Sequence, residues 1–151
     1  MKKIFYLLFL VSLGIILTGC NKDNLNLGGK SNYNITKDQV VINIDKESIT
    51  NTGIKITLVN KTENEYEYGS GFIVEYLKNN NWYSITPKKE IDYNMMSYTL
   101  EPKIEHTFEY NWKEIYGELP KGKYRIIKEL DLRKENNSFD KIVVATEFTI
   151  E

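Results

Sequence analysis

Apolar and polar residues alternate along most of the chain between Asp38 and Glu151. Successive side chains of a strand point to opposite faces, so alternation with a period of two predicts half-buried β-strands. Three asparagines at positions 79–81 predict a hairpin turn, because asparagine tolerates the left-handed backbone conformation. The helical pattern is confined to a single turn over residues 112–116, which Gly117 bounds. The predicted strands lie near residues 40–44, 54–58, 72–77, 82–86, 98–100, 108–112, 122–132 and 141–150.

About seven or eight short strands separated by turn residues, without an amphipathic helix, are typical of a β-sandwich or a small barrel. A length of roughly 114 residues suits one domain with one hydrophobic core. Residues 38–151 are therefore predicted to form a single all-β domain of antiparallel strands.

A corner-like sequence precedes one of the predicted strands. Leu119 and Pro120 are followed by Gly122 and then by Tyr124 near the strand start. This order resembles the corner before strand F of an immunoglobulin-like sandwich, where a tyrosine hydroxyl bonds to the backbone a few residues upstream. Tyr124 is predicted to make that hydrogen bond, with Pro120 and Gly122 forming the corner.

The aromatic and glycine landmarks of the chain are similar to those of a bacterial Ig-like domain family found in secreted and lipid-anchored Firmicute proteins. The resemblance covers about Val40 to Glu151 and implies an Ig-like β-sandwich in an extracytoplasmic setting. It transfers no catalytic residues, and the absence of a cysteine pair leaves hydrophobic packing to hold the two sheets together. The landmarks are Tyr68-Gly69-x-Gly71-Phe72, Trp82-Tyr83, Tyr98-x-Leu100-x-Pro102, Trp112 and the segment 116–126.

The first twenty residues have the anatomy of a secretion signal. Lys2 and Lys3 precede an apolar run of about 14 residues, too short for the roughly 20 that span a bilayer. The run closes on Leu17-Thr18-Gly19-Cys20, and Cys20 is the only cysteine in the chain. Such sequences resemble bacterial lipoprotein precursors, in which diacylglycerol is attached to the cysteine thiol. Residues 1–19 are therefore predicted to be a signal peptide that is cleaved between Gly19 and Cys20.

Lipidation predicts a protein that is anchored to the cell membrane on its extracytoplasmic face. The two acyl chains of diacylglycerol suffice for stable anchoring, whereas one chain binds only marginally. Residues 20–37 are polar, contain Gly28-Gly29 and lack a sustained period, so they predict a flexible tether between the lipid and the domain.

Composition argues against several classes of chemistry. The 20 basic and 21 acidic residues leave no basic excess for nucleic acid. His106 is the only histidine, so no metal site is expected, and it is read as a surface strand residue. Gly69-Ser70-Gly71 is not a nucleophile elbow but a bulge or a close backbone approach. We expect no enzyme and no cofactor besides the covalent diacylglycerol on Cys20.

A run of acidic residues allows two interpretations. Glu63, Glu65, Glu67 and Glu75 could furnish a glycosidase pair, which needs two carboxyl groups across a cleft. Acidic residues at a period of two more often form the solvated face of a strand, and that is the prediction we adopt.

Aromatic residues exceed the demand of a modest core and predict a surface that binds a protein or a glycan at the cell surface. The function expected is a non-catalytic binding or envelope-assembly module. The alternative is an Ig-like inhibitor of extracellular proteases, although the chain lacks an Asn-Pro-Thr-Thr-Gly type loop. The predicted binding residues are Trp82, Tyr83, Tyr93, Met95 and Met96.

Overall fold

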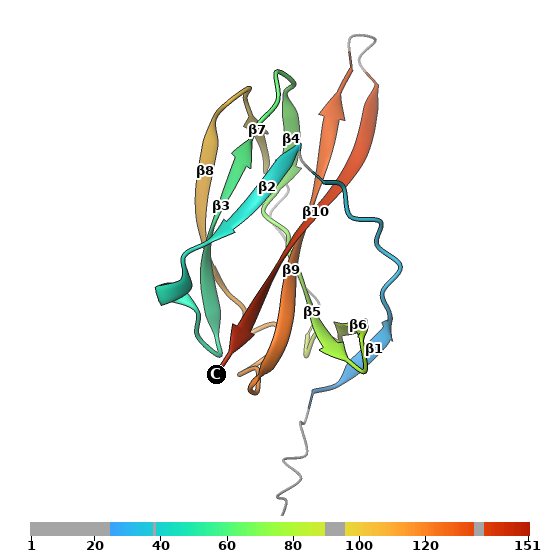
Figure 1. Ribbon diagram of the computed structural model, residues 1–151, viewed down its shortest axis with the longest axis vertical. Coiled ribbons are helices and arrows are strands. Elements are labelled where there is room, and N and C mark those ends of the chain that lie inside the picture. Colours follow the sequence, from blue (N-terminus) through green and yellow to red (C-terminus); the bar gives the residue numbers. More distant parts are fainter. Residues whose placement is uncertain (1–24, 38, 90–95, 135–137) are drawn as a thin grey trace, which may run out of the picture.

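The computed structural model describes residues 25–37, 39–89, 96–134 and 138–151 as a sandwich of two antiparallel sheets (Figure 1). A 3₁₀ turn, η1 (Lys46–Ser48), follows the first strand of the smaller sheet. That sheet has the order β2-β3-β8 and contains β2 (Val40–Ile44), β3 (Gly53–Asn60) and β8 (Glu105–Asn111). The larger sheet contains β1 (Leu27–Lys30), β4 (Tyr66–Gly69), β5 (Ile73–Lys78), β6 (Asn81–Ile85), β7 (Ser97–Leu100), β9 (Gly122–Arg133) and β10 (Phe139–Ile150).

Strand β9 organises the larger sheet because it is paired along both edges. On one edge β10 pairs with it over its full length. On the other edge β5 pairs with its first half and β4 with its last residues, and the path continues to β6 and β1 on one side and to β7 on the other. All described pairings are antiparallel, so the predicted antiparallel all-β sandwich is confirmed.

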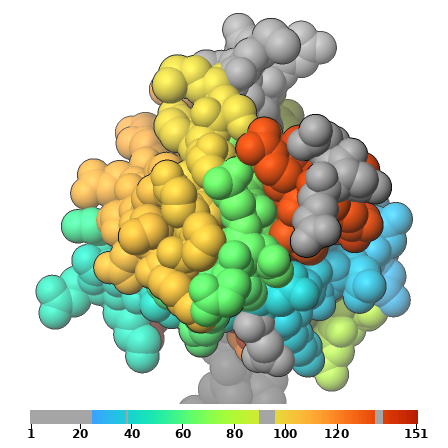
Figure 2. Space-filling model, turned by 90° about the horizontal axis from the view of Figure 1, so that it is seen from above, coloured from blue at the N-terminus to red at the C-terminus, as the bar shows by residue number. Residues whose placement is uncertain are grey.

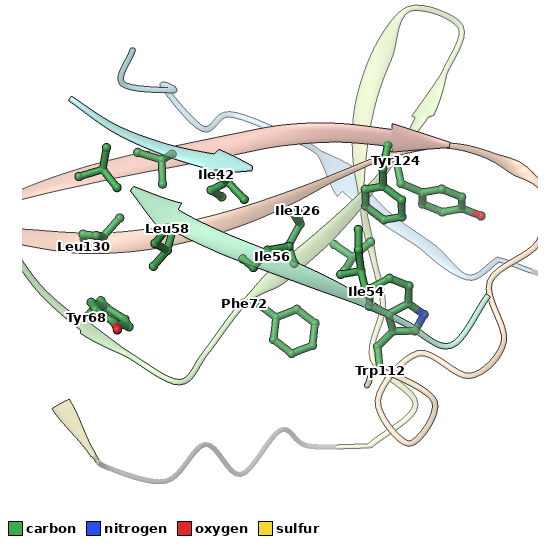
Figure 3. Packing of buried hydrophobic residues seen from close by; sticks show 14 of the residues in the cluster. Ile42, Ile54, Ile56, Leu58, Tyr68, Phe72, Trp112, Tyr124, Ile126 and Leu130 are labelled. Atoms are coloured by element: carbon green, nitrogen blue, oxygen red, sulfur yellow. The ribbon is translucent and has the colours of Figure 1, made fainter. Parts of the chain in front are cut away.

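The core lies between the inward faces of the two sheets (Figure 3). Ile54, Ile56 and Leu58 of β3 alternate with polar residues and are almost fully buried. They pack in one cluster with inward residues of β9, including Ile126 and Leu130. Burial of this apolar surface is the main force that holds the sheets together.

The predicted corner is present. The Tyr124 hydroxyl donates to the Pro120 carbonyl oxygen at 2.6 Å, and the ring is fully buried. The predicted turn over residues 112–116 is also present, since the Tyr116 amide donates to the Trp112 carbonyl at 2.8 Å and Gly117 follows with a φ of 84°. Trp112 itself lies just beyond β8 rather than within it, and its indole donates to the Asn51 carbonyl at 2.9 Å.

The prediction of a flexible tether over residues 20–37 is wrong for the part that the structure describes. Residues 25–37 form a strap along the larger sheet, which we call the N-terminal strap. Its strand β1 pairs with β6, and the Ser31 and Thr36 amides donate to the Trp82 and Val143 carbonyls at 2.8 and 2.7 Å. The strap covers an edge of β6 that would otherwise lack a partner, so backbone pairing outweighs the polar side-chain pattern.

Gly28 explains how so polar a segment can pair closely. A Cβ atom at this position would lie 2.4 Å from the Ser84 hydroxyl oxygen, so only glycine fits without a shift. Gly28, which suggests flexibility in the sequence, therefore serves a close approach of two strands, whereas Gly29 faces open space. Residues 1–24, with the predicted signal peptide and Cys20, lie outside the described residues, and no described helix is long and apolar enough to cross a membrane.

Candidate functional site

The three predicted binding residues that the structure describes, Trp82, Tyr83 and Met96, do not lie together on one surface. Trp82 and Tyr83 are half-buried in β6, and the Arg125 guanidinium lies 4.7 Å from the centre of the Trp82 ring. Met96 is 55% exposed just before β7, at the opposite edge of the larger sheet. Tyr93 and Met95 lie outside the described residues. Trp82 is therefore committed to an internal contact, which makes it a poor member of an open binding surface.

A bulge separates β4 from β5 along their shared edge with β9. Glu67 is opposite Asp131 and Ile73 is opposite Ile127, so residues 68–72 face the shorter stretch 128–130. We call residues 68–72 the bulge. The extra residues break the ladder here, as the sequence Gly69-Ser70-Gly71 predicts.

Lys128 of β9 closes the bulge from inside the sandwich. Its side chain points inward with those of Ile126 and Leu130, and the residue is only 1% exposed. The ammonium nitrogen donates to the Gly69 carbonyl at 2.7 Å and also to the Gly71 carbonyl. Two carbonyl groups that the broken ladder releases are thereby satisfied by one side chain.

Two aromatic rings complete the surroundings of the buried ammonium. The Lys128 nitrogen lies 5.3 Å from the centre of the Tyr68 ring and 5.6 Å from that of Tyr110, within the range of cation–π attraction. Burial nevertheless lowers the pKa of Lys128 from 10.5 to about 8, because the charged form loses its hydration. No carboxylate among the described residues forms an ion pair with it.

A cavity of about 320 Å³ lies at the bulge, lined by bulge residues that include the buried Tyr68 and Phe72 and by outward-facing residues of β9 and β10. Ile73 and Ile127, which are register partners on β5 and β9, give it an apolar wall. A Cβ atom on Gly69 would have no heavy atom nearer than 4.0 Å, so the missing side chain leaves space here. The lining includes Gly69, Ile73, Ile127, Glu129, Asp131 and Lys141.

The charges beside the cavity are not balanced. Arg133 pairs with Glu65 and Glu67 at 3.2 and 2.9 Å, and Lys141 pairs with Glu129 at 3.0 Å. The hydrogen bond and charge of Glu129 raise the pKa of Lys141, with smaller contributions from the charge of Asp131 and from Tyr33. Asp131 forms no ion pair in the described part of the chain. The outward face beside the bulge therefore has an excess of negative charge.

The acidic run is only partly solvated. Glu63 is highly exposed beside Lys103, and Glu65 and Glu67 lie on the outward face, as predicted. Glu75 contradicts the prediction because it is fully buried, with Oε2 accepting from the Arg125 Nε at 2.6 Å. A buried cation directly opposite on β9 makes this burial possible.

His106 of β8 connects the smaller sheet to β4 of the larger sheet. Its Nδ1 lies 2.7 Å from the Tyr68 hydroxyl, and its Nε2 lies 3.9 Å from Glu101. In Figure 2 the orange segment that contains β8 lies against the green segment that contains β4. Burial, aided by nearby Tyr98 and Glu101, raises the pKa of Tyr68 to about 12, so its phenol stays protonated at neutral pH.

The sequence-based prediction does not include Lys128, Arg125 or the burial of Glu75. It also does not include the cavity residues Ile73, Ile127 and Asp131. One signal was available for Lys128, since it occupies an inward position in the alternation of Tyr124, Ile126 and Leu130. No group of three histidine, cysteine, aspartate or glutamate side chains that could hold a metal ion occurs in the described ranges.

Comparison with known families agrees with this architecture. Residues 36–149 match the bacterial Ig-like domain family, and the chain belongs to that family. No curated protein matches the chain.

Proposed function

We propose that this protein is a membrane-anchored extracytoplasmic lipoprotein whose Ig-like domain is a non-catalytic binding or envelope-assembly module. Domains of this family are typically non-catalytic and usually extracellular or at the surface. The observation that carries the proposal is the motif Leu17-Thr18-Gly19-Cys20 at the end of a short apolar run. The only cysteine of the chain occupies the position at which diacylglycerol would be attached.

The N-terminal strap limits how far the domain can lie from its anchor. Strand β1 begins at Leu27, so the seven steps from Cys20 to Leu27 span at most about 25 Å. A lipid on Cys20 would therefore hold the β1 and β6 edge of the sandwich close to the headgroups. The domain would act at the membrane surface and not at the end of a long flexible linker.

Substitution of the lipidated cysteine tests the proposal. We expect the wild-type protein to incorporate a palmitate analogue, to lose residues 1–19 and to sediment with membranes. Cys20→Ala should incorporate no label and should accumulate as an unprocessed or mislocalised precursor, because the acylated thiol is required before cleavage. Fluorescence of the labelled band, intact mass and membrane fractionation measure these outcomes.

Ser12→Ala is the matched control, since it lies in the apolar run but outside the motif. It should be labelled and processed like the wild type. A membrane-bound, cleaved and unlabelled wild-type protein, or an unchanged Cys20→Ala protein, would refute lipid anchoring.

A further inference from the structure

We propose that the cavity at the bulge binds a lysine side chain of a partner protein. The proposal rests on the proposed function, for which it names the binding site and the chemistry of the partner. The ligand chemistry is a primary ammonium group on an apolar stem of four carbons. Three independent features of the described residues support it: an apolar wall, an excess of carboxylate over cationic side chains, and a backbone held open from inside.

The apolar wall suits the stem of the ligand. Ile73 and Ile127 are neighbours across β5 and β9 and line the cavity. A cavity of about 320 Å³ is at the lower end of the range for small-ligand sites. Ile127 is fully buried, so methylene groups that enter the cavity would leave water and contact Ile73 first, as the stems of lysine residues do on apolar surfaces.

The charge around the cavity selects a cation. The two cations beside the cavity each contact a glutamate already: Arg133 pairs with Glu65 and Glu67, and Lys141 pairs with Glu129. Asp131 is opposite Lys141 in register, and its charge adds to the raised pKa of Lys141, but the close ion pair of the Lys141 ammonium is with Glu129. One further positive charge would form an ion pair with Asp131. An ammonium group can do this with a single carboxylate oxygen, whereas a guanidinium favours two-point contacts.

The cavity is formed before any ligand arrives. Lys128 binds the Gly69 and Gly71 carbonyls from the inner side and so fixes the path of the bulge. Gly69 contributes no side chain to the space that it lines. A preorganised site loses less conformational entropy on binding, so even a single side chain can bind to it.

Methyl NMR of the full-length protein in detergent micelles, with labelled isoleucine residues, tests the proposal directly. The probe is lysine capped as its acetyl methylamide, and the matched probe is capped norleucine, which has the same stem without the charge. We expect the capped lysine to shift the Ile73 and Ile127 methyl signals with saturation and to bind about tenfold more tightly than capped norleucine. Equal affinity of the two probes, or shifts away from these two residues, would overturn the proposal.

Two variants locate the site. Gly69→Leu should fill the cavity and abolish the saturable shifts, whereas Gly29→Ala, which adds a methyl group in open space on β1, should leave them unchanged. Asp131→Asn should reduce the preference for lysine over norleucine to about one, and it keeps the test valid if Gly69→Leu fails to fold. Retention of a tenfold preference in Asp131→Asn would contradict the assigned charge contact.

Two further experiments are needed. One distinguishes a lysine side chain from a free small amine, and the other distinguishes failure of cavity binding from failure of lipid anchoring. Tighter binding of free n-butylamine than of capped lysine would assign the cavity to a small amine and overturn a protein partner. The full-length Cys20→Ala protein should keep the lysine titration, because the cavity lies in the folded domain. Failure of lipid anchoring and failure of cavity binding are therefore seen in different measurements.

Discussion

Two buried cations on the same strand solve the problem of burial in different ways. Arg125 faces outward from β9 and is 9% exposed, whereas Lys128 faces inward and is 1% exposed. The guanidinium of Arg125 contacts the Glu75 carboxylate at 2.6 Å and lies over the Trp82 ring. The amine of Lys128 has carbonyl oxygens and aromatic rings around it instead.

The difference follows from the chemistry of the two side chains. A guanidinium cannot lose its proton inside a protein, so its burial requires a fixed opposite charge. A lysine amine can lose its proton, and burial lowers its pKa to about 8. A neutral amine still has two N–H groups, which are enough for the Gly69 and Gly71 carbonyls. The contribution of Arg125 to stability therefore depends on the Glu75 carboxylate, while the contribution of Lys128 depends on pH.

The largest expected effect comes from removing Arg125. Arg125→Met leaves the Glu75 carboxylate buried without its cation, and one of its oxygens already lacks a hydrogen-bond partner. We expect the free energy of unfolding to fall by about 3–5 kcal/mol. The double variant Glu75→Leu, Arg125→Met should recover most of this loss, because the two apolar side chains face each other across β5 and β9. Urea unfolding of the three proteins measures the effect.

Lys123→Met is the matched control, since Lys123 also lies on β9 but its ion pair with Glu147 is about half exposed. Its loss should cost less than about 1 kcal/mol. A double variant as unstable as Arg125→Met would show that the stability comes from something other than charge pairing.

The second effect concerns Lys128 and appears only at alkaline pH. Above about pH 8 the folded protein releases the Lys128 proton, while the unfolded chain keeps it up to about pH 10.5. The unfolded state then binds more protons, so stability rises with pH in this window. Relative to Lys128→Met, the free energy of unfolding of the wild type should rise by about 1.4 kcal/mol per pH unit between about pH 8 and 10. Urea unfolding at pH 7, 8, 9 and 10 measures it.

Lys141→Met provides a control of opposite sign, because hydrogen bonding to Glu129 raises the pKa of Lys141. Its folded state binds the proton more tightly, so its contribution does not increase over this window. The raised pKa of Tyr68 is shared by the wild type and Lys128→Met and cancels in the difference. Parallel pH profiles of those two proteins would contradict a buried amine that loses its proton near pH 8.

The sequence predicts the sandwich well because its strands bury one face each. The alternation in β3, the corner at Tyr124 and the turn after Trp112 are local patterns with local causes. The strand predictions omit β1 and, apart from the alternating glutamates, β4. Strand β1 is held by backbone pairing with β6, which leaves no periodic mark on its side chains.

The sites are harder to predict because they depend on which charged residues meet across strands. Glu75 and Arg125 are 50 positions apart, and only the register of β5 and β9 places them opposite each other. In the sequence, Lys128 is a charged residue within an otherwise apolar face. Only the folded bulge shows the carbonyl groups that bind its ammonium. Ser31 lies in a segment that predicts a tether, yet its hydroxyl accepts from Arg125 Nη2 at 2.9 Å.

Loss of the contact between Ser31 and Arg125 should have the smallest effect on stability. It should also affect Arg125 without affecting Lys128. Ser31→Ala removes one acceptor from Arg125 but leaves the Glu75 pair intact, so the free energy of unfolding should fall by only about 1 kcal/mol. Because the hydroxyl fastens the N-terminal strap to β9, the amides of Ser31 and Thr36, which donate to Trp82 and Val143, should exchange faster with deuterium. The alkaline rise in stability that Lys128 produces should stay unchanged, since that amine lies on the other face of the strand.

Hydrogen exchange measures the protection of the strap amides, and urea unfolding at pH 7 to 10 measures the alkaline rise in stability. A uniform increase in exchange throughout β9 and β10 would show that Ser31 supports the whole sheet and does not act on the strap alone.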